Sequence, residues 1–243
     1  MPTIAIYSLK GGVGKTSIAV NLAFTAATCR RRTLLWDLDP QGASSWLLGG
    51  DGPSADSADS VFARDIPADR LIRPTAFPDL DLLPADASLR KLDGLFGALG
   101  KRKRLLRLLE SLEGRYDRIL LDCPPGLTET SEQVARAATL IVAPVIPSPL
   151  ARRAFDEVVD HFARAPGRHA PILPIFSMVD RRRALHLATI AEQPNWPIVP
   201  MASAVEQMAA RRLPVALFAP GSAPVQAFAA LWTGIERRLA ETT

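Results

Sequence analysis

Cysteine, tyrosine and histidine are scarce in this chain, which has two, two and three of them in 243 residues. The two cysteines, Cys29 and Cys123, are too few for a disulfide framework. No run approaches the 18 uninterrupted apolar residues that a membrane span requires. The chain begins directly with a strand pattern, which leaves no room for a signal peptide. We therefore expect a cytoplasmic protein.

The composition is that of a globular protein, with 48% hydrophobic and 22% charged residues. Short apolar runs alternate with helical patterns, and this order is typical of parallel strands joined by crossover helices. No internal repeat or linker divides the chain. We therefore predict one α/β domain over residues 1–243, with a mostly parallel, twisted sheet that helices flank on both faces.

The predicted elements follow from these patterns. Gly49–Ser60, rich in Gly, Asp and Ser, is predicted to be a surface loop. Strands are expected at Thr3–Ser8, Thr33–Asp37, Leu80–Pro84, Arg118–Asp122, Leu140–Pro144, Ile172–Ser177 and Ile198–Pro200. Helices are expected at Lys15–Thr28, Ser88–Gly97, Lys101–Glu113, Thr130–Ala137, Pro149–Arg164, Leu185–Glu192, Ala204–Arg212 and Pro224–Ala240.

The stretch SLKGGVGKTS, residues 8–17, follows the first predicted strand and opens the first predicted helix. It matches the phosphate-loop pattern G-x-x-x-x-G-K-[ST] except at its first glycine, where Leu9 stands. Its glycines let backbone N–H groups face an anion, Lys15 would reach the β- and γ-phosphates, and the Thr16 hydroxyl would ligate Mg²⁺. A turn that serves only packing is the alternative. The predicted nucleotide-binding residues are Lys10, Gly11, Gly12, Val13, Gly14, Lys15, Thr16 and Ser17.

Acidic residues end two further predicted strands. Asp122 closes one of them and suits a carboxylate that organises the water shell of Mg²⁺. Asp37 closes the other and is followed by Asp39, and both could face the same crevice as the phosphate loop. A rigid turn that could sense the γ-phosphate comes directly after Asp122, at Pro124, Pro125 and Gly126.

Together, K-G-G-V-G-K-T, D-L-D-P-Q-G and L-L-D-C-P-P resemble the ParA/MinD family of deviant Walker ATPases, most closely its short, Soj-like partition proteins. The resemblance implies slow, partner-stimulated hydrolysis of ATP with Mg²⁺. It also implies a homodimer with ATP sandwiched at the interface. Lys10, which the general phosphate-loop pattern does not require, resembles the family's signature lysine that reaches the partner's nucleotide across that interface.

The resemblance also implies roles for other residues. Asp39 resembles the residue that positions the attacking water, so Lys10, Lys15 and Asp39 are the predicted catalytic set. Thr16, Asp37 and Asp122 are the predicted metal-site residues, although Asp37 is also expected to support its loop. The switch residues would be Asp39, Pro40, Gln41, Pro124, Pro125 and Gly126, and Pro200 and Met201 would contact adenine.

The partition branch of the family implies non-specific DNA binding by the ATP dimer and activation by a ParB-like partner. The protein would then be nucleoid-associated and would position a plasmid, a chromosome origin or a protein cargo. Every basic residue after position 150 is arginine, which suits phosphate contacts. The candidate DNA-binding residues are Arg181, Arg182, Arg183, Arg211 and Arg212; a solvated charged face is the alternative. Ala204 stands where chromosomal ParA proteins often have a basic residue.

Proteins with the same fold have other functions, and three of these are alternatives here. A MinD-like protein would bind membrane through a C-terminal amphipathic helix, but the apolar residues of 225–239 fit a helix packed on the sheet. An amidoligase or dethiobiotin-synthetase relative would need a small-molecule pocket that the sequence does not reveal. A nitrogenase-type iron protein would need cysteines placed to bridge a dimer, and Cys29 and Cys123 are poorly placed for this.

Overall fold

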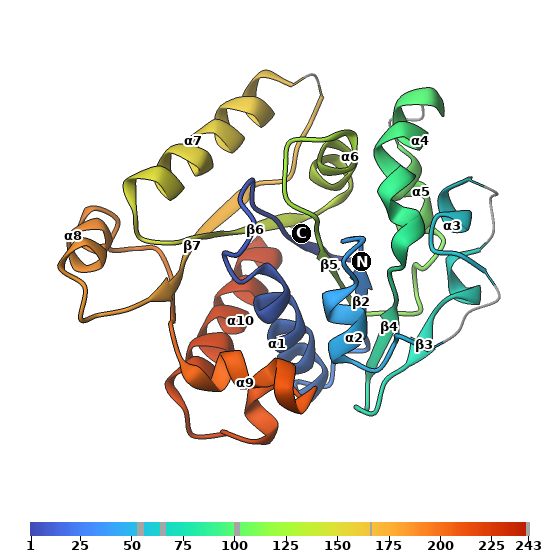
Figure 1. The fold of residues 1–243 in the computed structure, drawn as a ribbon. Helices are drawn as coiled ribbons and strands as arrows, with labels where there is room; N and C mark the ends of the chain where they lie inside the picture. The colour runs from blue at the N-terminus through green and yellow to red at the C-terminus, as the bar shows by residue number, and fades with distance from the viewer. Residues whose placement is uncertain (53–55, 64–66, 100–102, 166, 242–243) are drawn as a thin grey trace.

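The computed structural model describes residues 1–52, 56–63, 67–99, 103–165 and 167–241. Its centre is one eight-stranded sheet of order β3-β4-β2-β5-β1-β6-β7-β8 (Figure 1). Only β3 runs antiparallel to its neighbour, which confirms the predicted mostly parallel sheet. The strands are β1 (Thr3–Ile6), β2 (Thr33–Asp37), β3 (Arg73–Pro74), β4 (Leu80–Leu83), β5 (Arg118–Asp122), β6 (Leu140–Val145), β7 (Ile172–Val179) and β8 (Ile198–Pro200).

Helices cover both faces of the sheet, as predicted (Figure 1). One face packs against α1, α2, α9 and α10, and the other packs against α3 to α7. The helices are α1 (Lys15–Thr28), α2 (Ala43–Leu47), α3 (Ser60–Ala63), α4 (Leu92–Leu99), α5 (Arg104–Glu110), α6 (Glu129–Ala137), α7 (Pro149–Arg164), α8 (Ala184–Glu192), α9 (Ser203–Arg211) and α10 (Ala223–Glu241), with 3₁₀ turns η1 (Ala68–Arg70), η2 (Ala87–Lys91) and η3 (Val215–Leu217).

The central strands are buried along their length because helices cover both of their faces. The apolar residues of α10, among them Phe228, Trp232 and Ile235, are also buried against the sheet. This confirms the interpretation of residues 225–239 as a core-packing segment. Within the described ranges, no helix has the length and apolar character needed to cross a bilayer.

The structure departs from the predicted elements in several places. The helix expected at Ser88–Gly97 is divided into η2 and α4, while the one expected at Lys101–Glu113 appears as α5, with residues 101 and 102 outside the described ranges. Helices α2 and α3 and strand β3 were not predicted. These elements are two to five residues long, too short to show a periodic apolar pattern.

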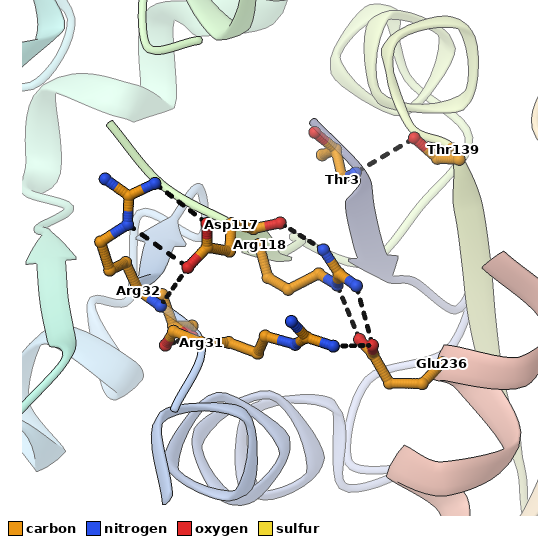
Figure 2. Close-up of polar contacts among 8 residues, drawn as sticks. Thr3, Arg31, Arg32, Asp117, Arg118, Thr139 and Glu236 are labelled. Atoms are coloured by element: carbon orange, nitrogen blue, oxygen red, sulfur yellow. Dashed lines mark hydrogen bonds and ion pairs between the residues drawn. The ribbon is translucent and has the colours of Figure 1, made fainter. Parts of the chain in front are cut away.

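An arginine network fastens α10 to the end of the sheet where β2 and β5 begin (Figure 2). Arg118 on β5 binds both carboxylate oxygens of Glu236 on α10, at 2.6 and 2.7 Å. Arg31, in the turn before β2, donates to the same carboxylate at 3.2 Å. Arg32 binds the Asp117 carboxylate through its backbone N–H and its guanidinium. Ion pairs therefore connect α10 and the turn before β2 to the amino ends of β2 and β5.

The opposite end of the sheet holds the predicted site. Strand β1 pairs with β5 on one side and β6 on the other, and β5 pairs in turn with β2. The chain therefore reverses its direction of winding beside β1, and in parallel sheets ligands bind in the crevice outside the carboxyl ends of the strands at such a point. The loops that follow β1, β2 and β5 all begin at this edge.

Candidate functional site

The phosphate loop connects β1 to α1 across this edge. Gly12 and Gly14 have left-handed backbones, with φ of 72° and 89°, so a side chain at either position would be strained. Gly14 is the N-cap of α1, and no side chain caps that helix end in the described structure. The first N–H groups of α1 and its positive dipole end are thus available to an anion. Leu9, in place of the first glycine, packs against the core beneath α3 to α7.

The two lysines of the loop have different surroundings. Lys15 is only 7% exposed, and its Nζ donates to the carbonyl oxygen of Lys10 at 3.4 Å. The ammonium group is thereby held inside the loop, at the opening of α1. Lys10 is half-buried, and its backbone N–H donates to the Ser8 hydroxyl at 3.3 Å. Its predicted contact across a dimer interface remains a prediction.

Asp37 and Asp122 are paired residues of β2 and β5, and both are fully buried. Burial raises the pKa of both carboxyl groups; for Asp37, the charge of Asp122 raises it further. The hydrogen bond from Ser44, the nearby Thr16 hydroxyl and the charge of Lys15 act in the opposite direction on the Asp122 pKa. The structure thus brings Lys15 and Thr16, at the start of α1, together with Asp122, at the end of β5, although more than a hundred residues separate them in the sequence.

The Asp122 carboxylate is suited to Mg²⁺. Its Oδ2 accepts a hydrogen bond from the Ser44 hydroxyl, whereas its Oδ1 is buried without a partner among the described residues. A buried, unpaired carboxylate oxygen is costly unless a ligand satisfies it. With the Thr16 hydroxyl beside it, Asp122 could accept a water of the Mg²⁺ shell, while nucleotide phosphates would supply further oxygen ligands.

The Asp37 carboxylate, unlike that of Asp122, has hydrogen-bond donors at both of its oxygens. Its Oδ2 accepts from the backbone N–H and the hydroxyl of Ser45, at 2.9 and 2.7 Å, and its Oδ1 accepts from the Asp39 N–H at 3.1 Å. Both oxygens are therefore occupied by the loop and by the first turn of α2. These contacts favour a supporting role over the predicted metal ligation.

The two predicted switch segments are turns with defined internal bonds. In the first, Asp39 Oδ1 accepts from the Gln41 N–H at 3.0 Å, and the Asp39 carbonyl accepts from Gly42 at 2.8 Å. Pro40 lies between them. In the second, Pro124 and Pro125 lead into Gly126, which has a left-handed φ of 102°.

The Gly126 turn is joined to the phosphate loop and to α6. The Gly126 carbonyl accepts a hydrogen bond of 2.8 Å from the hydroxyl of Tyr7, the residue that directly precedes the phosphate loop. A capping box formed by Thr128 and Ser131 starts α6 immediately after the turn. The position of this segment is therefore set by the strand that carries the phosphate loop.

The predicted adenine contacts, Pro200 and Met201, lie beside the phosphate loop. A hollow of about 60 Å³ has Gly14 and Ser17 on one side and Pro200 and Met201 on the other. Val13, Ile18, Val199, Val205 and Phe228 line it with apolar groups. The placement is compatible with the prediction, because a purine attached to phosphates on the loop would need an apolar slot next to α1.

The five candidate DNA-binding arginines belong to two segments, one before α8 and one at the end of α9, and these two helices lie apart in Figure 1. Arg181, Arg182 and Arg183 occupy the turn between β7 and α8, whereas Arg211 and Arg212 end α9. Arg182 binds both oxygens of Asp180, at 2.9 and 3.0 Å, and this pairing lowers the pKa of Asp180 to about 2.

The arginines at the end of α9 also differ from each other. Arg211 is exposed, contacts Gln207 at 3.3 Å and lies over the Phe218 ring. Arg212 donates to the Trp46 carbonyl at 2.8 Å and pairs with Asp51 at 2.6 Å. Arg181, Arg183 and Arg211 are therefore the members of the predicted set without a carboxylate partner among the described residues, whereas Arg182 is paired although its side chain is exposed.

Several residues of the site were not predicted from sequence. Ser44 and Ser45 bind the two buried acids, and Tyr7 holds the Gly126 turn. A serine pair shortly after an acidic strand end is a weak signal by itself. Its meaning depends on the fold, because Ser44 and Asp122 are 78 positions apart in the chain.

A parallel sheet with a glycine-rich phosphate loop after its central strand, and a buried acid on the neighbouring strand, defines a P-loop ATPase. A family model described as an AAA domain matches residues 1–170. The chromosome partitioning protein ParA of Caulobacter vibrioides is 34% identical over 190 residues, which cover 75% of this chain and 71% of that protein. The chain therefore belongs to the ParA/MinD family of ATPases, as its motifs indicate.

Solved structures share the whole fold. The cell division ATPase MinD of Pyrococcus furiosus superposes with a TM-score of 0.80 at 24% identity, covering 97% of this chain and 98% of that one. The cobyrinic acid a,c-diamide synthase of Mycobacterium smegmatis, solved with an ATP analogue and magnesium, gives 0.82 at 23% identity, covering 98% and 94%. At these identities the likeness extends to the fold alone.

Proposed function

We propose that the protein is a slow, Mg²⁺-dependent ATPase that dimerises around ATP and binds DNA non-specifically as that dimer. A ParB-like partner would stimulate hydrolysis and release the protein from DNA. Repeated binding and release would position a plasmid, a chromosome origin or a protein cargo. The protein would then act in the cytoplasm, in association with the nucleoid.

The observation that carries this proposal is the pair of lysines in one phosphate loop, in a chain of the ParA/MinD family. The Lys15 ammonium is already held inside the loop by the Lys10 carbonyl. A second ammonium beside it is repelled unless a strongly negative ligand lies between the two. A cation that reaches a neighbouring protomer's triphosphate would stabilise charge during phosphoryl transfer and would link hydrolysis to dimerisation.

The DNA-binding part of the proposal is supported by the exposed arginines in the turn between β7 and α8 and at the end of α9. Arg181, Arg183 and Arg211 are exposed and have no carboxylate partner among the described residues, while Arg182 is exposed but paired with Asp180. Phosphate-directed cations are sufficient for binding without sequence preference, and such binding weakens steeply as salt rises. An ATP dimer would present each of these groups twice, which would make binding depend on the nucleotide state.

The test is retention of the purified protein on DNA with ATP, ADP or no nucleotide, at two salt concentrations. We expect retention with ATP only, loss at the higher salt, and loss of the ATP effect in Lys10→Ala. The control is Lys91→Ala, which removes an equal charge from an exposed position in η2 and should behave like wild type. ATP-driven dimerisation without retention on DNA would leave the arginines as a solvated face.

The partner is a separate part of the proposal. An activator of this family would act through a basic N-terminal peptide, and acidic groups of residues 51–150 could receive it. Hydrolysis should rise when the partner is added to the ATP- and DNA-bound protein. A partner that lacked its N-terminal segment and still stimulated hydrolysis would remove this link.

A second candidate is an ATP-dependent amidoligase, which the fold of cobyrinic acid a,c-diamide synthase favours. Such an enzyme would transfer phosphate from ATP to a carboxylate and would not need DNA. If small carboxylates stimulated ATP consumption and DNA did not, this activity would replace the first proposal. A MinD-like membrane role would need a free amphipathic helix, whereas the apolar side of α10 is buried. Binding to anionic lipid vesicles tests it directly.

A further inference from the structure

Arg212 ends α9 in a left-handed backbone conformation, with a φ of 53°. Glycine is the residue favoured at such a helix end, because any side chain is strained there. Strain of this kind persists where the surrounding structure enforces it, and it gathers at functional sites. An arginine at this position therefore calls for an explanation from its side-chain contacts.

The backbone on both sides of Arg212 is anchored to α1, the helix that follows the phosphate loop. Asn21 of α1 is 3% exposed, donates to the Met208 sulfur at 3.0 Å and accepts from the Val215 N–H at 3.0 Å. The Arg212 N–H donates to the Met208 carbonyl at 2.7 Å. The position of residue 212 is thus fixed relative to α1.

The Arg212 side chain extends to the end of α2. Its Nε and one terminal nitrogen donate to the Trp46 carbonyl, and the guanidinium lies over the Trp46 ring. The same terminal nitrogen pairs with Asp51 at 2.6 Å. The last carbonyls of a helix lack partners within it, so a planar guanidinium that donates twice to one of them fixes the position of that end.

Helix α2 in turn contacts the two buried acids of the metal site. Ser44 donates to the Asp122 carboxylate. Ser45 binds the Asp37 carboxylate with its backbone N–H and its hydroxyl. The helix is only five residues long, and helices of this length are not stable by themselves, so outside contacts set its position. The carbonyl that Arg212 binds belongs to the residue directly after these serines, so a shift at that end would move both of them.

We propose that Arg212 is a positioning residue for the Mg²⁺ site, which fixes α2 relative to α1 and thereby keeps Ser44 and Ser45 bonded to the two acids. The proposal rests on the Mg²⁺-dependent ATPase activity proposed above. Arg212 acts through α2 and the Ser44 bond on Asp122, whose carboxylate is suited to the Mg²⁺ shell. Residues that orient the ligands of a metal without touching it can change metal affinity about tenfold or more.

The experiment measures ADP binding by calorimetry in EDTA and at a series of Mg²⁺ concentrations. Arg212→Ala should raise the Mg²⁺ concentration for the half-maximal gain in ADP affinity by about three- to tenfold and leave the affinity in EDTA unchanged. Arg152→Ala is the matched control and should behave like wild type. Arg152 also lies over a tryptophan ring, that of Trp196 at 5.3 Å, and pairs with Asp156 at 2.9 Å, but it belongs to α7.

Arg212→Gly separates the side chain from the backbone. Glycine adopts a φ of 53° without strain, so this variant should unfold at a higher temperature than Arg212→Ala. Both variants lack the guanidinium and should show the same shift in Mg²⁺ dependence. Without nucleotide or Mg²⁺, hydrogen exchange of the Ser45 N–H should be faster in both than in wild type, because α2 opens more readily.

The role of Arg212 is overturned if both variants keep the Mg²⁺ dependence of wild type, if ADP affinity in EDTA falls equally, or if glycine restores what alanine loses. Adding Arg212→Ala to Ser44→Ala should shift the Mg²⁺ dependence much less than Arg212→Ala does alone, and additive shifts would contradict an action through α2. A wild type whose ADP affinity does not depend on Mg²⁺ would instead refute the proposed Mg²⁺-dependent ATPase. Hydrogen exchange at Ser45 would then still decide whether Arg212 fixes α2.

Discussion

The guanidinium of Arg212 lies 4.8 Å from the centre of the Trp46 ring, and its Nε donates to the Trp46 carbonyl at 2.8 Å. Trp46 belongs to α2 and Arg212 ends α9 with a left-handed φ of 53°. Arg212 therefore caps the carbonyl end of one helix and terminates another. Its neighbour Arg211 has no carboxylate partner within the described chain.

These contacts predict different effects for two adjacent arginines. Arg211→Ala should weaken ATP-dependent DNA binding and reduce the slope of log affinity against log salt by about one. Arg212→Ala should leave that slope unchanged and lower the unfolding temperature by about 2–4 °C, because α2 loses its connection to α9. Salt titrations of DNA binding and thermal unfolding measure the two effects. A reduced slope in Arg212→Ala would return that residue to the DNA-binding set.

A pH dependence follows from the buried acid pair. The ordinary pKa of an aspartate is 3.8, whereas burial and the nearby Asp122 raise the pKa of Asp37 to about 7, and hydrogen bonds from Ser45 partly oppose this rise. Between these values the folded protein binds the proton more tightly than the unfolded chain. The contribution of Asp37 to stability is therefore greatest at low pH and is lost as the pH rises through this window.

The measurement is urea unfolding of the nucleotide-free, metal-free protein between about pH 5 and about pH 8. Asp37→Asn cannot ionise, so its stability relative to wild type should improve with pH, by at most about 1.4 kcal/mol per pH unit inside the window. Asp117→Asn is a control at the far end of the sheet, where Arg32 lowers the pKa of the carboxyl group. A relative stability of Asp37→Asn that does not change with pH would contradict the raised pKa.

Most long elements could be predicted because their apolar patterns report burial directly. Continuous apolar runs marked β1, β2, β5 and β6, which the fold buries on both faces. These patterns could not predict the order of the strands in the sheet. Strand β5 lies between β1 and β2, although it follows both of them in the sequence by many residues. The short edge strand β3, which contains Pro74, shows no alternating pattern at all.

The site was predictable to the extent that each loop carried its own motif. The phosphate loop and Asp122 were identified from local sequence, and the fold places them together. The roles of Ser44, Ser45 and Arg212 depend on contacts between distant segments, which no local motif records. The same limit explains why five arginines from two segments of the chain were predicted as a single DNA-binding set, although ion pairs distinguish its members.

The Arg118–Glu236 pair should contribute measurably to stability because it is partly shielded from water. The two side chains are 14% and 21% exposed and make two charged hydrogen bonds. Glu236→Ala would leave Arg118 and Arg31 without this partner, and we expect a loss of about 1–3 kcal/mol in the free energy of unfolding. Urea denaturation measures the change.

The matched control for this pair is Asp160→Ala, which breaks the exposed Asp160–Arg164 pair of α7. Exposed pairs contribute little, so the loss there should stay below about 0.5 kcal/mol. Equal losses in the two variants would mean that the pair holding α10 gains nothing from its burial.

Asp39 offers the sharpest test of the proposed catalytic arrangement, because its Oδ1 is used locally by the Gln41 N–H. Asp39→Asn keeps an oxygen that can accept this bond, whereas Asp39→Ala removes it, so the pair separates loop structure from the carboxylate charge. If the charge positions the attacking water, both variants should bind ATP and lose hydrolysis by about a hundredfold or more.

With hydrolysis blocked, the ATP state should persist, and both Asp39 variants should remain on DNA longer than wild type after free ATP is removed. The decisive comparison is Asp39→Asn, measured by phosphate release and by the rate of dissociation from DNA. Wild-type hydrolysis in this variant would show that the carboxylate does not act on the water. Lost hydrolysis only in Asp39→Ala would assign Asp39 to the structure of its turn, because the asparagine preserves the bond to Gln41.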